Sequence, residues 1–157
     1  MAEDGVRIVR ATVAEAATVV AMIHELLAEL RGGASGLDLP AAVALCETLL
    51  AEYRYTAFLA IDGASEAAIG LITLTETTTV YARGTFGIIQ ELYVAPAHRS
   101  QGVGHRLIAA AEAEGRTWGW RGIQVGAPDP ARFARSVAFY KREGFRIIGP
   151  RLGRSIV

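Results

Sequence analysis

The stretch that decides the fold reads Glu91-Leu-Tyr-Val-Ala-Pro-Ala-His-Arg99-Ser-Gln-Gly102-Val-Gly104. The apolar run before it predicts a strand over 86–94, and a helical pattern follows from about residue 102 to residue 119. At the start of such a helix, several amides point outward and the helix dipole favours an anion. Gly102 and Gly104 have no Cβ, so a diphosphate can approach the backbone closely. The permanent charge of Arg99 lies beside it.

Three other interpretations of this turn can be weighed from the sequence. A dinucleotide-binding turn needs a third glycine, and Leu107 stands at that position. A nucleoside-triphosphate loop needs lysine and then serine or threonine after its last glycine, but His105 and Arg106 follow Gly104. The third alternative is a helix start with two glycines and no ligand, because short glycine motifs are weak signals.

The whole chain narrows the function further. Its 157 residues suit one domain over 1–157, and 52% hydrophobic residues against 20% charged ones allow a buried core. The 16 basic and 16 acidic residues cancel, which argues against a general nucleic-acid binder. Cys46 is the single cysteine and predicts neither a disulfide nor a metal cluster. The acidic N-terminus and the lack of a long apolar stretch favour a cytoplasmic protein without a membrane anchor.

The order of elements predicts one mixed α/β domain. We expect a strand at 6–10, a capping box from Thr12 to Glu15, and helices over 16–30 and 38–52, the second capped by Asp38. Strands follow at 56–61, 68–75 and 86–94, with a turn over 77–84. After the helix at 102–119, we expect a strand at 123–126, a helix from residue 129 to 143 ended by Gly144, and a last strand at 145–148.

Two motifs together resemble a known family. The first is the Arg99-x-x-Gly102-x-Gly104 turn after its strand, and the second is Phe139-Tyr140-x-x-x-Gly144-Phe145. They resemble the coenzyme A signature and the later helix-to-strand segment of the GNAT superfamily of N-acetyltransferases. The resemblance implies a central, mostly antiparallel mixed sheet flanked by about four helices. It departs at Phe133, where many members have an asparagine that contacts the cofactor.

The resemblance implies acetyl-CoA as co-substrate, with no metal. The strand before the turn would splay from its neighbour and offer the backbone of Leu92 and Val94 to the pantetheine arm, the Leu92 amide donating to the oxyanion. Tyr140 matches the family's general acid, although its helical spacing also suits a core tyrosine. The cofactor contacts predicted on this basis are Leu92, Tyr93, Val94, Arg99, Ser100, Gln101, Gly102, Val103, Gly104 and Tyr140.

Glu91 is the candidate general base, since a partly desolvated carboxylate beside the reaction centre has its pKa raised towards a useful range. Strand alternation turns Glu91 and Tyr93 to one face and Leu92 and Val94 to the other, and leaves open which face is the cleft. A solvated or ion-paired glutamate is the alternative. Glu76 and Tyr81 in the neighbouring hairpin are reserve candidates.

The predicted function is acetyl transfer from acetyl-CoA to a primary amine of a small molecule or a protein. The alternatives are a non-catalytic coenzyme A-binding regulatory module and a structural α/β domain whose glycine turn only starts a helix. The acceptor is not readable, because the loop from Arg31 to Asp38 and the hairpin carry no recognisable pattern. Dimers are common among similar proteins, so a homodimer stays open.

Overall fold

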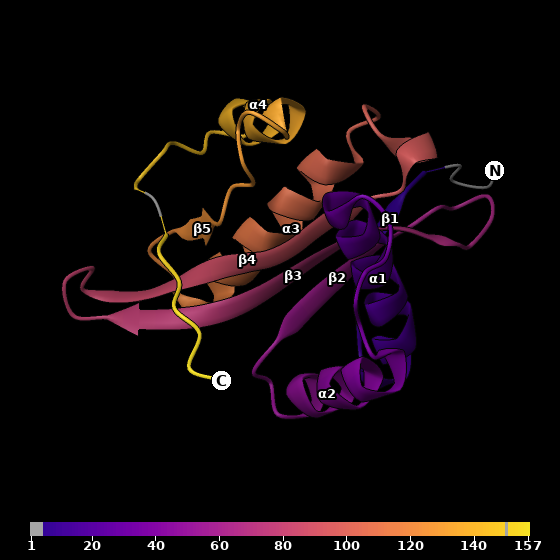
Figure 1. The fold of residues 1–157 in the computed structure, drawn as a ribbon, viewed down its shortest axis with the longest axis horizontal. Coiled ribbons are helices and arrows are strands. Elements are labelled where there is room, and N and C mark those ends of the chain that lie inside the picture. The colour runs from indigo at the N-terminus through magenta and orange to yellow at the C-terminus, as the bar shows by residue number, and fades with distance from the viewer. Residues whose placement is uncertain (1–4, 150) are drawn as a thin grey trace.

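A five-stranded sheet runs through the computed structural model, which describes residues 5–149 and 151–157 (Figure 1). Its strands lie in chain order, and all neighbours pair antiparallel except the last two, which are parallel. The strands are β1 (Arg7–Arg10), β2 (Thr56–Ile61), β3 (Ala68–Thr79), β4 (Gly84–Val94) and β5 (Ile123–Val125). The α-helices are α1 (Ala16–Arg31), α2 (Leu39–Ala51), α3 (Val103–Trp118) and α4 (Ala134–Arg142). The predicted fold class is confirmed.

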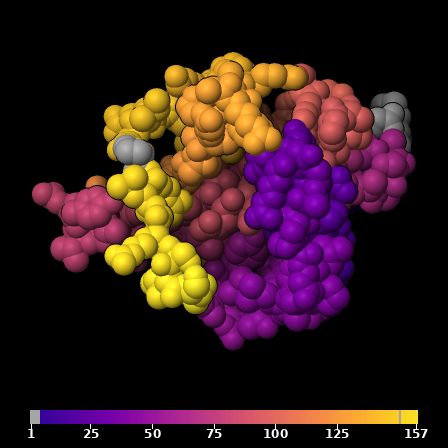
Figure 2. All heavy atoms as spheres, viewed as in Figure 1, coloured from indigo at the N-terminus to yellow at the C-terminus, as the bar shows by residue number. Residues whose placement is uncertain are grey.

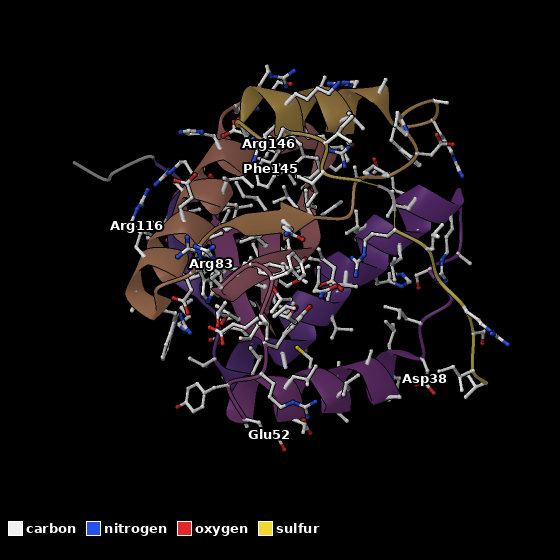
Figure 3. All side chains as sticks on the ribbon, turned by 90° about the vertical axis from the view of Figure 1, so that its left-hand side faces the viewer. Asp38, Glu52, Arg83, Arg116, Phe145 and Arg146 are labelled. Atoms are coloured by element: carbon white, nitrogen blue, oxygen red, sulfur yellow. The ribbon has the colours of Figure 1, made fainter. Side chains whose placement is uncertain are left out.

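Local capping signals place the first helices. The capping box is confirmed: the Ala14 and Thr12 amides donate to the Thr12 hydroxyl and the Glu15 carboxylate, which starts a short 3-10 turn (Val13–Glu15) that leads into α1. The Asp38 side chain accepts a hydrogen bond from the Ala41 amide at 3.1 Å, as expected for the cap of α2. Figure 3 shows Asp38 and Glu52 at opposite ends of that helix.

Each face of the sheet carries its own buried core. One core lies beneath α1 and α2 and includes Val19, Cys46 and Tyr93. The other lies beneath α3 and includes Leu107 and Ile89. Figure 1 accordingly shows α3 on one side of the sheet and the α1–α2 pair on the other, with α4 at the top of the view above β5. Each side chain of β4 therefore points either to the α1–α2 face or to the α3 face.

A bulge in β4 decides which environment each side chain meets. Thr73 of β3 is the register partner of Glu91, whereas the next residue, Leu74, is the partner of Ile89. Gln90 is the extra residue, and it reverses the alternation of the strand. As a result, Ile89 packs in the α3 core while Glu91 and Tyr93 turn towards α1 and α2.

Three sequence predictions are wrong in detail. The hairpin strands extend to Thr79 and back from Gly84, so its turn covers only 80–83. The last helix begins at Ala134, because Asp129 closes a separate turn on the Ala131 amide. Residues 145–148 form no strand: Ile147 and Ile148 are 78% and 65% exposed, so they lack the burial that would stabilise pairing. The left-handed conformation expected at Gly144 is confirmed by its φ of +88°.

Replacing Gly87 by alanine is expected to lower the free energy of unfolding by about 3 kcal/mol through overpacking. A Cβ at Gly87 would overlap the six-membered ring of Trp120. The ring has little room to move, because it also lies against the backbone of Gly115, where an added Cβ would come within 2.8 Å of it, and because its indole N–H donates to Glu76 at 2.7 Å. Urea unfolding of both proteins measures the difference.

Gly122→Ala is the matched control for this change. Gly122 is a neighbour of Gly87, because its carbonyl accepts a hydrogen bond from the Gly87 amide. A Cβ at Gly122 meets no atom within 4 Å. Equal losses in the two variants would contradict the packing explanation.

Candidate functional site

The two strands at the end of the sheet separate beside the predicted site. β5 pairs with β4 only at residues 87–89, and beyond them β4 continues to Val94 paired with β3 alone. The Ala95 amide donates to the Ile69 carbonyl of β3 at 2.9 Å. Because backbone groups alternate along a strand, the amides of Leu92 and Val94 turn the other way, towards the gap left by β5. The amides of Leu92 and Val94 thus face this gap, whereas the Val94 carbonyl accepts a hydrogen bond from Arg99.

The turn after β4 presents free amides at the start of α3. Ser100 and Gly102 both adopt left-handed backbone conformations, with φ of +60° and +81°. Within the part of the chain that the structure describes, the amides of residues 100–105 have no backbone acceptor, and no side chain caps the helix. A concave run of such amides at a helix N-terminus binds anions, phosphates in particular.

The two glycines of the turn have different neighbours. A Cβ at Gly102 would enter open space, so this residue leaves room for an approaching group. A Cβ at Gly104 would lie 2.9 Å from the ring of Phe139, so this glycine lets α4 approach α3. A hydrogen bond of 2.8 Å joins His105 of α3 to Glu143, the residue that follows α4. The turn and α4 are therefore packed as one unit.

Arg99 connects the turn to α1. Its Nε donates to the Val94 carbonyl at 2.8 Å, and its two terminal nitrogens donate to the Glu29 carboxylate at 3.0 and 2.6 Å. Hydrogen bonding from Arg99 lowers the pKa of Glu29, so the pair is charged at neutral pH. The guanidinium also lies 5.8 Å from the centre of the Tyr93 ring. Arg99 thus fixes the turn, and a direct phosphate contact stays a prediction.

The remaining predicted cofactor contacts differ in burial and in the groups that they touch. They are Tyr93, Val103, Ser100 and Gln101. Tyr93 is buried on the α1–α2 face, and Val103 anchors the first turn of α3 at 2% exposure. Ser100 is exposed, and the Gln101 side chain donates to the Ala97 carbonyl at 3.0 Å. The backbones of Ser100, Gln101 and Val103 belong to the turn at residues 100–105, called the amide turn below. Strand alternation directs the backbone groups of Tyr93 to β3 instead.

Glu91 lies in the middle of the sheet, on the α1–α2 face. Its Oε2 accepts hydrogen bonds from the hydroxyl of Tyr55, at 2.5 Å, and from the hydroxyl of Thr73. Sequence reasoning missed both donors. Thr73 carried a signal, since it is the one polar residue within the apolar run from Ile69 to Leu74, and it is fully buried.

Tyr140 lies on α4 with its ring between two other aromatic rings. The ring centres of Phe139 and Phe145 are 5.4 and 5.5 Å away. Burial raises the pKa of Tyr140 to about 12, so the phenol is protonated at neutral pH. Among the described residues, its hydroxyl has no hydrogen-bond partner, and no buried polar side-chain atom lacks one, so this hydroxyl is reached by solvent. A protonated donor is thus free to serve an incoming group.

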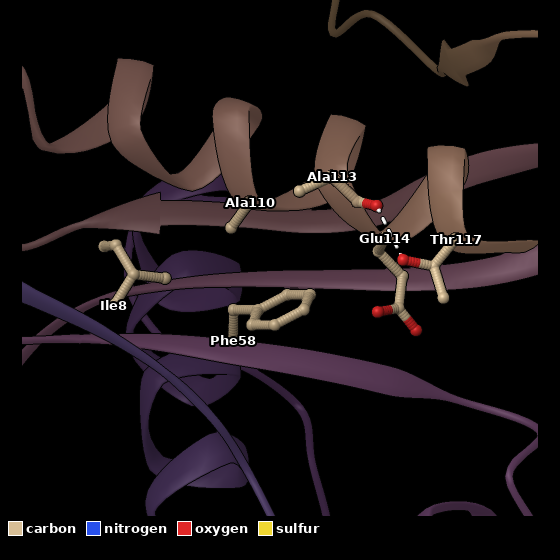
Figure 4. Close-up of a pocket in the computed structure, with 6 residues that line it drawn as sticks. All are labelled: Ile8, Phe58, Ala110, Ala113, Glu114 and Thr117. Carbon is tan, nitrogen blue, oxygen red and sulfur yellow. Dashed lines mark hydrogen bonds between the residues drawn. The ribbon is translucent and has the colours of Figure 1, made fainter.

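The reserve candidates and two pockets lie away from the turn at residues 100–105. Glu76 holds the Trp120 indole, and Tyr81 is 83% exposed at the hairpin turn. A pocket of about 270 Å³ lies against the second half of α3, far along that helix from its N-terminal turn, and is lined by Ile8, Phe58, Ala110, Ala113, Glu114 and Thr117 (Figure 4). A second pocket, of about 550 Å³, lies near the C-terminal end of the same helix, and its lining includes Trp118, the reserve candidate Glu76 and Tyr55, which donates to Glu91.

Figure 2 shows a further hollow between the α1–α2 pair and the C-terminal residues, with the sheet at its floor. This is the face onto which Glu91 projects. In the described residues, 5–149 and 151–157, no three His, Cys, Asp or Glu side chains are grouped to hold a metal ion. None of the helices there is both long and apolar enough to cross a membrane.

Comparison with known proteins identifies the family. A family model described as an acetyltransferase (GNAT) domain matches residues 53–147, which include the sheet from β2 to β5, the amide turn and α4. The chain belongs to the GNAT acetyltransferase family. The family uses acetyl-CoA. No curated protein matches the chain.

Solved GNAT-like structures have the same fold at low sequence identity. A predicted acetyltransferase of Clostridium acetobutylicum, solved with acetyl-CoA, superposes with a TM-score of 0.81 at 15% identity, covering 97% of each chain. A possible acetyltransferase of Clostridium difficile gives 0.79 at 18%, also over 97% of each chain. An aminoglycoside acetyltransferase from an uncultured soil sample gives 0.78 at 19%, over 98% of this chain and 99% of that one.

Proposed function

We propose that this GNAT protein, acting as one domain, transfers the acetyl group of acetyl-CoA to a primary amine of a small molecule or a protein. The observation that supports the proposal most is the run of unpartnered amides at residues 100–105, next to the gap where β4 leaves β5. The first feature suits a diphosphate and the second suits an extended arm with amide groups.

The proposed reaction starts with an acceptor that is an ammonium ion at neutral pH. Glu91, directly or through a water, takes one proton, and the free amine attacks the thioester carbonyl carbon. The carbonyl oxygen gains negative charge, and the Leu92 amide donates a hydrogen bond to it. The carbon–sulfur bond then breaks, Tyr140 gives its proton to the sulfur, and the nitrogen loses a second proton that restores the phenol. The products are an N-acetyl amine, coenzyme A and one proton.

The test has two stages. Calorimetry with acetyl-CoA asks whether the coenzyme binds, and release of the coenzyme thiol across a panel of primary amines then asks whether it reacts. Binding with turnover supports the enzyme. Binding without turnover on any amine favours the regulatory module, and no binding at millimolar acetyl-CoA removes both.

Gly102→Ala is expected to weaken acetyl-CoA binding about tenfold, because a Cβ enters the anion-facing surface and a left-handed backbone disfavours alanine by about 1 to 2 kcal/mol. Gly119→Ala is the matched control: Gly119 has a φ of +69° at the other end of α3 and also faces open space. Both variants should lose similar stability, while calorimetry shows a loss of affinity only for Gly102→Ala. Equal affinities in the two variants would argue against the turn as the diphosphate site.

A further inference from the structure

The carboxylate of Glu91 is held by one of its two oxygens. Both hydroxyl donors, Tyr55 and Thr73, reach Oε2, and no side chain among the described residues donates to Oε1. Two donors on one oxygen fix the rotation of a carboxylate about its last side-chain bond. The other oxygen is then left with a defined direction and free lone pairs.

Both donors are themselves fixed by the fold. Thr73 is fully buried in β3, directly opposite Glu91 in the register, and its hydroxyl also accepts a hydrogen bond from the Glu91 amide at 3.0 Å. Thr73 therefore binds both the main chain and the side chain of Glu91. This double contact occurs at the bulge, where the register of β3 and β4 changes. Bulges of this kind re-aim a side chain.

Tyr55 approaches from the same side of β4 as Thr73, but from one strand farther away. It immediately precedes β2 and packs against the α1–α2 core, so its ring crosses from one strand beyond β3 to reach Glu91. Burial raises the pKa of Tyr55 far above its ordinary value, and the negative charge of Glu91 raises it further. The hydroxyl consequently stays a hydrogen-bond donor throughout the neutral and mildly alkaline range.

We propose that Tyr55 and Thr73 are positioning residues, which hold Oε2 of Glu91 so that Oε1 faces the acceptor amine. This inference rests on the proposed function of Glu91 as the base. Neither hydroxyl touches a reacting atom. Each acts through the carboxylate, by keeping it in one orientation.

Single variants measure the contribution of each hydroxyl. Tyr55→Phe and Thr73→Val remove one donor each with little change of shape, and each is expected to lower kcat about tenfold while the KM for acetyl-CoA stays within twofold. Thr73→Ser keeps the hydroxyl and should retain at least a third of wild-type kcat. Equal losses in Thr73→Ser and Thr73→Val, or wild-type kcat in both Tyr55→Phe and Thr73→Val, would overturn the proposal.

A double-mutant comparison separates positioning from general damage to the fold. When Glu91 is already glutamine, a residue that acts through its carboxylate has little left to contribute, so adding Tyr55→Phe should lower kcat less than twofold. If the full tenfold loss recurs in that background, Tyr55 acts independently of Glu91 and the proposal is wrong.

A readout without turnover keeps this inference distinct from the proposed function. In a crystal structure of the Tyr55→Phe, Thr73→Val double variant, the Glu91 carboxylate should leave its wild-type position, and an unmoved carboxylate would overturn the proposal. Calorimetry on the wild-type protein tests the proposed function separately, because failure to bind acetyl-CoA counts against the enzyme and not against how Glu91 is held.

Discussion

Glu91→Gln is expected to lower kcat/KM for the acceptor amine by a factor of about 100 to 1,000, the usual contribution of a general base. Glutamine has nearly the same shape, and its amide oxygen can still accept from the Tyr55 and Thr73 hydroxyls that hold the native side chain. It cannot take a proton at neutral pH, so the acceptor remains an ammonium ion. The coenzyme thiol assay on the best amine of the panel measures the loss.

The pH dependence of the loss of kcat/KM in Glu91→Gln gives a second test of the general base. As pH rises towards the pKa of the acceptor, a growing fraction of the amine is deprotonated without help, so the ratio of wild-type to variant kcat/KM should shrink. Glu76→Gln is the matched control, since Glu76 lies in the same hairpin but on the α3 face, bound to Trp120. Activity that survives Glu91→Gln but falls tenfold or more in Glu76→Gln would move the base to the reserve candidate.

Sequence patterns predicted well those features that depend on neighbours in the chain. The capping box at Thr12 and the Asp38 cap each join residues three apart, so their hydrogen bonds follow from local spacing. The glycine turn was also visible, because free amides need only a strand, a turn and a helix start in succession. The left-handed conformation of Gly102 agrees with the residue type at that position.

Contacts between segments far apart in the chain could not be predicted from the sequence pattern. The pair between Arg99 and Glu29 links residues 70 positions apart, and the hydrogen bond from Tyr55 to Glu91 links residues 36 apart. The apolar run of 86–94 gave no sign of the bulge, although without it Ile89 and Tyr93 would share a face. A bulge depends on how two strands register with each other, and the pattern of one strand does not contain that information.

The prediction of a final strand at 145–148 was wrong for a related reason. Its apolar residues are typical of a strand, but a strand needs a neighbour to pair with and a surface that buries one face. β5 has three residues, and the two isoleucines that suggested the strand are mostly exposed. Composition therefore predicted the propensity of 145–148 correctly and its pairing wrongly.

Tyr140→Phe is expected to lower kcat about 100-fold and to leave the affinity for acetyl-CoA within twofold. Phenylalanine keeps the ring contacts with Phe139 and Phe145, so α4 stays packed against the amide turn. It removes the proton that the sulfur needs as the carbon–sulfur bond breaks. Calorimetry and the thiol assay measure the two quantities, and Tyr81→Phe, at the exposed hairpin turn, is the control that should change neither.

The raised pKa of Tyr140 fixes the sign of a pH test on the same residue. Because burial brings that pKa to about 12, the phenol keeps its proton until the solution approaches that value, so wild-type kcat should show no alkaline fall caused by Tyr140 below about pH 10, the ordinary pKa of tyrosine. The ratio of wild-type to Tyr140→Phe kcat should accordingly stay constant from about pH 7 to about pH 9. A ratio that collapses to one in this range would show that the hydroxyl has lost its proton there, and an unchanged kcat in the variant would remove Tyr140 from the mechanism.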